Sequence, residues 1–286
     1  MKVLVTGATG FVGSYVVNTL LKLKHEVIAT SLNESKALLA DWYNQVLYIP
    51  FDITNPTLYL GKDQSISEYF KRPDHVIHLA WKGVSDCTGM FHIEKNLMQH
   101  YDFLKMLVVD GVQGLTITGT CLEYGFKNGM KSEEHPPKPS VAYAIAKDAL
   151  RRFLVELQKH ASFSLQWVRL FYMYGKGQHN RSLLQQLYTA ISNNEKFFNM
   201  SGGEQERDYL PVDLVAEYLV EIVTKGNKND IYNCCSGKPI KIKQFVEDEV
   251  KKMNAEIHLN LGFYPYKEYE PMSFWGNSEK IKKLLI

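Results

Sequence analysis

The stretch Thr6-Gly7-Ala8-Thr9-Gly10-Phe11-Val12-Gly13 decides the fold that this sequence predicts. A short β-branched and apolar segment (residues 2–6) precedes it, and an apolar stripe at helical spacing (residues 14–23) follows it. Glycines placed between a strand and a helix are typical of a dinucleotide-binding turn. The first permits a tight turn, the second lets the backbone approach a pyrophosphate, and the third lets the helix pack on the strand. The free N–H groups at the start of the helix then face the phosphates.

Strand and helix patterns continue to alternate after this turn. Further strands are expected over residues 26–30, 46–50, 76–80, 115–118 and 165–171, and long helices over residues 93–109 and 142–159. This alternation predicts an α/β fold, a Rossmann-type doubly wound parallel sheet with helices on both faces.

The pattern becomes less regular after residue 174. Helices are expected over residues 182–193, 212–225 and 242–253, and a strand over residues 230–234. We therefore expect two interleaved parts. Residues 1–172, with returning segments near 210–235, would form an NAD(P)-binding Rossmann domain, and residues 173–286 a small C-terminal cap that binds the substrate.

Composition and charge exclude several classes of protein. The 286 residues include 33 Lys and Arg against 31 Asp and Glu, so the net charge of +2 gives no electrostatic basis for a nucleic-acid partner. No apolar run approaches the roughly 18 residues of a membrane span, and the first residues lack the pattern of a signal peptide. The four cysteines form no CxxC pair and show no metal-ligand spacing. We expect a cytoplasmic protein with no metal site.

Tyr143-Ala-Ile-Ala-Lys147 is a second stretch with chemical content. Residues four apart lie on one face of a helix, so the Lys147 ammonium can lie beside the Tyr143 phenol. A nearby positive charge favours phenolate and would lower the pKa of Tyr143 from its usual value of about 10. Tyr143 is therefore a candidate proton donor to a carbonyl that is being reduced.

The motifs arrive in an order that resembles the extended short-chain dehydrogenase/reductase family over nearly the whole chain. The resemblance rests on the GxxGxxG spacing, on Tyr143 and Lys147 behind Thr118-Gly-Thr-Cys-Leu-Glu-Tyr-Gly125, and on Arg207-Asp-Tyr-Leu-Pro-Val-Asp213. It implies nucleotide-sugar chemistry with three catalytic residues. Thr120 would anchor the substrate oxygen, Tyr143 would transfer the proton, and Lys147 would orient the cofactor ribose.

The resemblance also implies where the cofactor binds. In this family an Asp often ends the second strand and binds the ribose hydroxyls of NAD, but Ser31 stands there in this sequence. A serine can donate to a 2′-phosphate that a carboxylate would repel, which favours NADP(H) over NAD(H). The other cofactor-binding residues expected are Gly7, Thr9, Gly10, Phe11, Val12, Gly13, Asp52, Ile53, Leu79, Ala80, Asn96, Tyr143, Lys147 and Phe171.

Substrate contacts are implied in the same way. Arg207 would contact the diphosphate, because a guanidinium suits bidentate phosphate binding, and Phe197 would face the nucleobase. Tyr172 stands where many members of the family carry Asn. Arg169 lies in an apolar strand and is expected to be structural. The expected substrate residues are Lys82, Thr120, Tyr143, Tyr172, Asn180, Phe197 and Arg207.

One departure from the family excludes an activity. Its dehydratases carry Asp-Glu directly after the threonine, as the acid and base for water elimination, whereas this sequence has Cys121-Leu122. Glu123 lies one position late and is expected to point elsewhere.

We therefore expect reduction of the C4 keto group of a (d)TDP-4-keto-6-deoxyhexose by NAD(P)H, for surface polysaccharide sugars, in a homodimer. Residues 119–125 and 270–276 resemble those of ketoreductases that make 6-deoxytalose, fucose or abequose units. An NAD-dependent 4-epimerase remains an alternative, since the same Thr, Tyr and Lys serve both reactions. A non-catalytic NADP-binding regulatory or scaffold protein is the alternative from another class, and the intact Thr120, Tyr143 and Lys147 argue against it.

Overall fold

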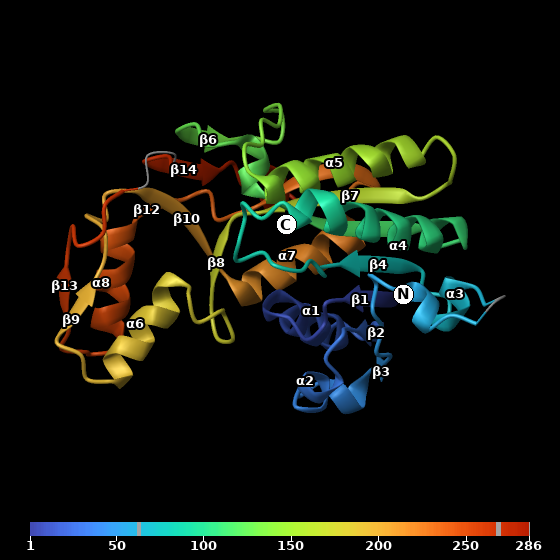
Figure 1. Cartoon of the computed structure of the whole chain (residues 1–286), viewed down its shortest axis with the longest axis horizontal. Coiled ribbons are helices and arrows are strands. Elements are labelled where there is room, and N and C mark those ends of the chain that lie inside the picture. The colour runs from blue at the N-terminus through green and yellow to red at the C-terminus, as the bar shows by residue number, and fades with distance from the viewer. Residues whose placement is uncertain (62–63, 267–269, 286) are drawn as a thin grey trace.

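A seven-stranded parallel sheet forms the centre of the larger part of the molecule (Figure 1). The computed structural model describes residues 1–61, 64–266 and 270–285. The strands, in the order in which they lie in the sheet, are β3 (Leu47–Tyr48), β2 (Glu26–Thr30), β1 (Lys2–Thr6), β4 (His75–His78), β5 (Gly114–Thr120), β7 (Ser164–Leu170) and β11 (Asn229–Cys234). The chain changes winding direction between β1 and β4, and in such sheets ligands bind at the carboxyl ends of the strands beside this point. The Rossmann-type fold is confirmed.

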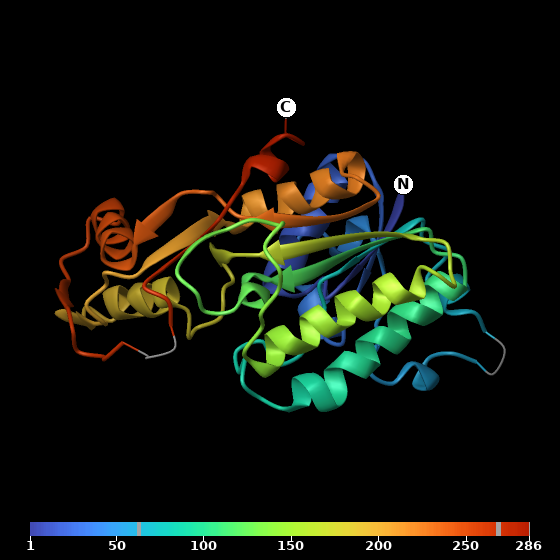
Figure 2. The same cartoon turned by 90° about the horizontal axis from the view of Figure 1, so that it is seen from above.

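Helices cover both faces of this sheet (Figure 2). α1 (Phe11–Lys22) and α7 (Val212–Lys225) pack together on one face, where Leu20 and Leu219 are fully buried. α4 (Leu97–Val109) and α5 (Ala142–Leu157) cover the other face together with α3 (Ile66–Tyr69). Each helix buries an apolar stripe against the sheet, which is the pattern expected of a doubly wound fold.

The second part of the molecule lies beyond the carboxyl ends of the central strands (Figure 1). Its sheet has the order β12 (Pro239–Lys241), β10 (Glu206–Pro211), β14 (Ser273–Gly276) and β6 (Gly129–Lys131), and β8 (Tyr172–Tyr174) also pairs with β10. Next to it lie α6 (Leu183–Ser192), α8 (Ile242–Lys252) and the pair β9 (Phe197–Asn199) and β13 (His258–Asn260). Leu187, Phe198 and Val246 form a separate small core there. The assignment of residues 173–286 to a substrate cap remains a prediction.

The remaining elements are short. They are α2 (Glu34–Leu38), α9 (Glu279–Lys282), the 3-10 turns η1 (Tyr43–Gln45), η2 (Pro56–Leu58) and η4 (Cys121–Tyr124), and the π-helical turn η3 (His92–Asn96). In the described part of the chain, no helix has the length and apolar character needed to cross a membrane.

Several predicted boundaries were wrong. α1 begins at Phe11 and not at residue 14, because Gly10 leads directly from the turn into the helix as its N-cap residue. The strand predicted over residues 46–50 is reduced to β3, which pairs with β2 over two residues. No strand was predicted over residues 206–211, but they form β10, which gains its partners β12 and β14 only from distant parts of the chain.

Candidate active site

The glycine turn after β1 has the geometry that its sequence predicted. Gly7 has a φ of 68°, and a Cβ atom there would lie 2.9 Å from the backbone nitrogen of Ala80. A Cβ atom on Gly13 would lie 2.1 Å from the carbonyl oxygen of Gly7. The tight turn and the close helix–strand packing therefore require glycine at both positions. The turn leaves a backbone cradle at the start of α1 that suits a dinucleotide pyrophosphate.

A pocket of about 430 Å³ lies in front of this turn, at the carboxyl ends of β1, β5 and β7. It brings residues from five separate stretches of the sequence into one wall. The predicted site residues that line it are Gly7, Gly10, Phe11, Val12, Gly13, Leu79, Thr120, Tyr143, Lys147, Phe171 and Tyr172.

A second pocket, of about 290 Å³, shares the glycine turn and extends along the other side of it. The further predicted residues that line it are Thr9, Ser31, Ile53, Ala80 and Lys82. Asp52 is not in this wall. Its Oδ1 atom accepts hydrogen bonds from the backbone N–H of Thr54 at 2.9 Å and from Thr54 Oγ1 at 2.6 Å. Of the two predicted neighbours Asp52 and Ile53, only Ile53 therefore lines the pocket.

The Ser31 hydroxyl already has two side-chain partners. Thr9 Oγ1 donates to Ser31 Oγ at 3.0 Å, and Ser31 Oγ lies 3.0 Å from the hydroxyl of Tyr48. The Tyr48 hydroxyl donates to the Ser31 carbonyl at 3.1 Å, so it accepts the Ser31 proton in the shorter contact. Ser31 keeps one lone pair for a ligand and has no proton left to donate.

Thr120 ends β5 and caps the short turn η4. Its Oγ1 atom accepts a hydrogen bond from the backbone N–H of Leu122 at 3.3 Å, and its own N–H donates to Glu123 Oε1 at 2.9 Å. This reciprocal capping box fixes the threonine at the pocket wall. The capping bond uses only a lone pair of Thr120, so its hydroxyl proton can point to the neighbouring Cys121 sulfur or to a substrate oxygen.

Glu123 points away from the pocket, as predicted from its position one residue late. Its carboxylate is fully buried and accepts hydrogen bonds from Trp167 Nε1 at 3.0 Å and from Arg169 Nε at 2.8 Å. Arg169 is 1% exposed and its guanidinium also lies over the ring of Tyr124. The structural role predicted for Arg169 is confirmed: the ion pair supports the turn that carries Thr120.

Tyr143 and Lys147 both line the pocket, but the expected electrostatic relation between them is wrong. Burial, and then the charge of Glu123, raise the pKa of Tyr143, whereas proximity to Lys147 was expected to lower it. The Lys147 ammonium donates instead to the carbonyl of Thr118 at 2.8 Å and lies 4.1 Å from the ring centroid of Trp81. Burial lowers the pKa of Lys147 to about 7, against an opposing effect of Glu123. Tyr143 therefore keeps its proton at neutral pH.

Asn96 lies outside both pockets and acts on the backbone. Its Nδ2 atom donates to the carbonyl of Lys82 at 2.8 Å, which ties the loop after β4 to the π-helical turn η3. The backbone N–H of Tyr143 donates to the carbonyl of Cys87 in the same loop at 3.0 Å. Asn96 therefore holds the loop that covers the start of α5. A direct contact of Asn96 with the cofactor had been predicted instead.

The remaining substrate candidates lie in the second part of the molecule. Asn180 and Phe197, which are distant in sequence, line one pocket of about 550 Å³ together with Tyr264. Arg207 is buried, lies over the ring of Tyr172 and has its Nη2 atom 3.7 Å from the Glu270 carboxylate. The structure places Tyr172 next to both the central pocket and Arg207.

Comparison with known proteins decides the family. The sequence model of the NAD dependent epimerase/dehydratase family matches residues 3–235. The chain belongs to this family. Its members are NAD-dependent enzymes that act on nucleotide sugars, as oxidoreductases or epimerases, so the family predicted from the motifs is confirmed.

Relatives within the epimerase/dehydratase family include both reductases and epimerases. The chain is 28% identical, over 96% of its length and 99% of the relative, to dTDP-6-deoxy-L-talose 4-dehydrogenase (NAD(+)) of Aggregatibacter actinomycetemcomitans. It is 24% identical to dTDP-4-dehydro-6-deoxyglucose reductase of Escherichia coli, over 89% of the chain and 82% of the relative. The UDP-glucuronic acid 4-epimerase of Bacillus cereus, solved with UDP-glucuronic acid and NAD, has the same fold, with a TM-score of 0.81 and 21% identity over 100% of this chain and 93% of that one.

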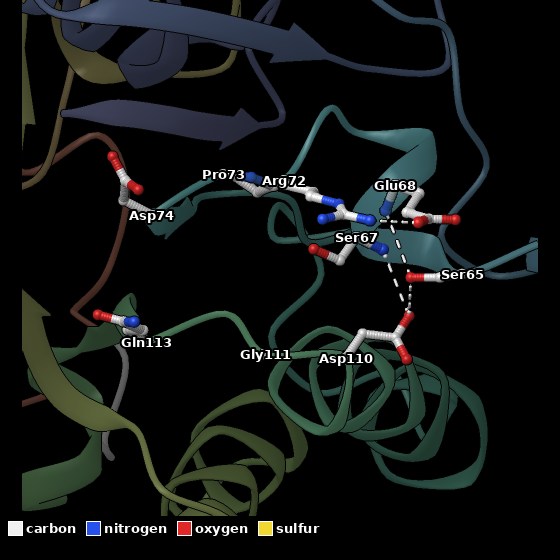
Figure 3. A pocket seen from close by; sticks show the side chains of 9 residues that line it. All are labelled: Ser65, Ser67, Glu68, Arg72, Pro73, Asp74, Asp110, Gly111 and Gln113. Carbon is white, nitrogen blue, oxygen red and sulfur yellow. Dashed lines mark hydrogen bonds and ion pairs between the residues drawn. The ribbon is translucent and has the colours of Figure 1, made fainter.

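A polar pocket at the opposite edge of the sheet contains none of the predicted site residues (Figure 3). Asp74 and Gln113, which line it, precede β4 and β5, so it lies at the amino ends of the strands. Asp110 accepts hydrogen bonds there from Ser65 Oγ at 2.8 Å and from the backbone N–H of Ser67 at 3.3 Å (Figure 3). This carboxylate joins α3 to the end of α4, and we assign the pocket no role in the chemistry of the family.

Trp81 and His100 are among the pocket residues that were not predicted from the sequence. The side chain of Trp81 lines both pockets, and His100 lines the second. Trp81 directly follows the strand predicted over residues 76–80, and this position was the one signal that could have identified it. His100 faces the site only because α4 packs beside β4, so no local pattern indicated it.

Proposed function

We propose that the protein is a nucleotide-sugar 4-ketoreductase that reduces the C4 keto group of a dTDP-4-keto-6-deoxyhexose. The observation that carries the proposal is the convergence of Thr120, Tyr143 and Lys147 on one pocket with the glycine turn. The similarity to a relative named as a dTDP-6-deoxy-L-talose 4-dehydrogenase supports the sugar and the position of the carbonyl. The 4-epimerases among the relatives support the rival reaction, so the choice between the two needs an experiment.

In the proposed reaction a bound reduced dinucleotide supplies the hydride, and the side chains of this chain handle the proton. Tyr143 holds a proton on its hydroxyl, since burial raises its pKa, and gives it to the C4 oxygen as that oxygen gains negative charge. Thr120 donates its hydroxyl proton to the same oxygen and fixes its position. The Lys147 ammonium, held at the pocket wall by Thr118, orients the cofactor ribose.

Water elimination has no acid–base pair at the expected place. Burial raises the pKa of the Cys121 thiol to about 12, and Leu122 carries no titratable group. The turn η4 directs Glu123 into its buried ion pair with Arg169. This arrangement supports the proposal that the chain is not a dehydratase.

The deciding measurement is the fate of the reduced cofactor. Given NADH and a dTDP-4-keto-6-deoxyhexose, the purified protein should consume one reduced nicotinamide per keto sugar, seen as loss of its near-ultraviolet absorbance. With deuterated cofactor, the new C4 hydroxyl should carry deuterium at that carbon. An unchanged absorbance, together with interconversion of an NDP-hexose and its C4 epimer, would show that the 4-epimerase alternative is correct.

For the cofactor, we propose NAD(H) in preference to the NADP(H) that Ser31 had suggested. The comparisons give the NADP preference no support, because the dehydrogenase relative is named for NAD(+). The hydrogen bonds of Ser31 with Thr9 and Tyr48 support the same choice. The free lone pair of Ser31 can accept a hydrogen bond from a ribose hydroxyl, whereas a 2′-phosphate needs hydrogen-bond donors.

Tyr48→Phe should weaken the preference for NADH over NADPH. The substitution frees the Ser31 proton, which can then donate to a 2′-phosphate, so the ratio of the NADPH to the NADH dissociation constant should fall by about 2- to 10-fold, the value of one hydrogen bond. Calorimetric titration of both cofactors would measure it. Tyr43→Phe is a matched control, because the Tyr43 ring packs on Tyr48 without a hydroxyl contact to Ser31. Tighter binding of NADPH than NADH by the wild type would contradict the proposal.

The homodimer, the role in surface polysaccharide synthesis and the cytoplasmic location remain predictions. So do the contacts of Arg207 with the diphosphate, of Phe197 with the nucleobase and of Asn180 with the substrate.

A further inference from the structure

Trp81 lies against both catalytic candidates on α5. Its ring centroid is 4.1 Å from the Lys147 ammonium, and the rings of Trp81 and Tyr143 meet edge to face with centroids 6.2 Å apart. Trp81 also lines both the central pocket and the adjoining pocket on the other side of the glycine turn. The tryptophan is therefore placed where it can influence cofactor binding and proton transfer.

A hydrogen bond on one edge of the indole fixes its orientation. Trp81 Nε1 donates to His92 Nδ1 at 2.9 Å, and His92 Nε2 lies 2.8 Å from the carbonyl of Asp86. An indole N–H can only donate and a carbonyl can only accept, so His92 is neutral and carries its proton on Nε2. His92 is fully buried in the π-helical turn η3, which holds this acceptor in place.

A stacked imidazole fixes the plane of the indole. The rings of Trp81 and His100 lie 4.4 Å apart at an angle of 24°. His100 Nδ1 lies 2.8 Å from His78 Nε2, and His78 Nδ1 lies 2.9 Å from Thr6 Oγ1, so the stack is linked to β4 and β1. Burial lowers the pKa of His78 to about 3 and that of His100 well below its usual value. Both imidazoles are therefore uncharged and do not compete with Lys147 for the indole.

We propose that Trp81 is a positioning residue, whose ring holds the Lys147 ammonium in its charged form at the cofactor pocket. In this way Trp81 sets the upper pH limit of dinucleotide binding; the inference rests on the proposed role of Lys147 in orienting the cofactor ribose. The contact is of the cation–π type, which stabilises the ammonium and not the neutral amine.

The charge of Lys147 depends on a balance in which this contact takes part. The side chain is 1% exposed, and burial lowers its pKa to about 7. Glu123, in η4, acts in the opposite direction and favours the ammonium. The other titratable groups that surround it are Tyr143 on α5, His78 on β4 and His100 on α4, all neutral near pH 7. Without the indole, Lys147 should lose its proton at lower pH.

The test is the pH dependence of NADH binding, which requires no sugar substrate. The dissociation constant should rise above the pH at which Lys147 loses its charge, and Lys147→Met should abolish this rise. In Trp81→Leu the rise should begin about 0.5 to 1.5 pH units lower, the shift that corresponds to a cation–π contact. Trp81→Phe keeps an aromatic face, so the pH at which the rise begins should move less. His92→Leu leaves the indole without its hydrogen-bond acceptor and should move this pH part of the way. Trp275→Leu, at a half-buried position of β14, should leave the pH at which the rise begins unchanged.

A pH dependence in Trp81→Leu equal to that of the wild type, with the fold intact by circular dichroism, would overturn the inference. An equal weakening of NADH binding at every pH would also overturn it, because the indole would then contact the cofactor and not act through Lys147. If Trp81→Leu does not fold, Trp81→Phe and His92→Leu provide the same comparison. A shifted pH limit in a protein that reduces no 4-keto sugar would support the inference and contradict the proposed function.

Discussion

Tyr143→Phe should lower kcat by about 10²- to 10⁴-fold, the usual contribution of a general acid. The phenyl ring can keep the packing of Tyr143 against His92 and Trp81, so the fold and NADH binding should change little. Only the transferable proton is lost. Rates in single-turnover conditions, with the dissociation constant of NADH measured separately, would distinguish the loss of the proton from a loss of binding.

Tyr232→Phe is the matched control for this experiment. Its hydroxyl accepts a hydrogen bond from the backbone N–H of Asn227 at 2.7 Å, beside the amino end of β11 and away from the pocket. It should lower stability slightly and leave kcat unchanged. A Tyr143→Phe enzyme that keeps more than about a third of the wild-type rate would remove Tyr143 from the mechanism.

Glu123→Gln should destabilise the protein by about 3–5 kcal/mol, because it leaves the Arg169 guanidinium buried without its counter-charge. Arg169 is 1% exposed and its Nη1 atom has no hydrogen-bond partner among the described residues, so the structure offers little to replace the carboxylate. The turn that carries Thr120 should loosen as well, since Glu123 accepts the N–H of that residue. Chemical denaturation would measure the change in the free energy of unfolding.

Two further variants distinguish the loss of the buried ion pair from the loss of a negative charge at an exposed position. Glu156→Gln removes the same charge from a pair with Lys159 in which both side chains are about two-thirds exposed, and it should lower stability far less than Glu123→Gln. Glu123→Gln combined with Arg169→Met removes both buried charges and should restore part of the lost stability. Equal stabilities of Glu123→Gln and the wild type would contradict the structural role of the pair.

Local patterns in the sequence were sufficient for the architecture and for much of the site. The glycine spacing after β1 has a steric cause, since a Cβ atom at Gly7 or Gly13 would meet backbone atoms, and such a requirement appears in the residue types themselves. The pair Tyr143 and Lys147 lies on one helix face by its spacing alone, and Thr120 ends a strand whose carboxyl end faces the same pocket. Hydrophobic periodicity located the long helices and most strands, because these elements bury one face along their whole length.

The sequence by itself thus determined the parallel sheet, the dinucleotide turn and the three residues that meet at the pocket. The tertiary structure decided the charge states around them, because burial and partners from other strands, and not neighbours in the chain, set the cost of a charge. It placed Lys147 against Trp81 and Thr118, raised the pKa of Tyr143 and engaged the Ser31 proton with Tyr48. It also brought β6, β10 and β14 together from three distant segments, since short strands form only where partners meet them.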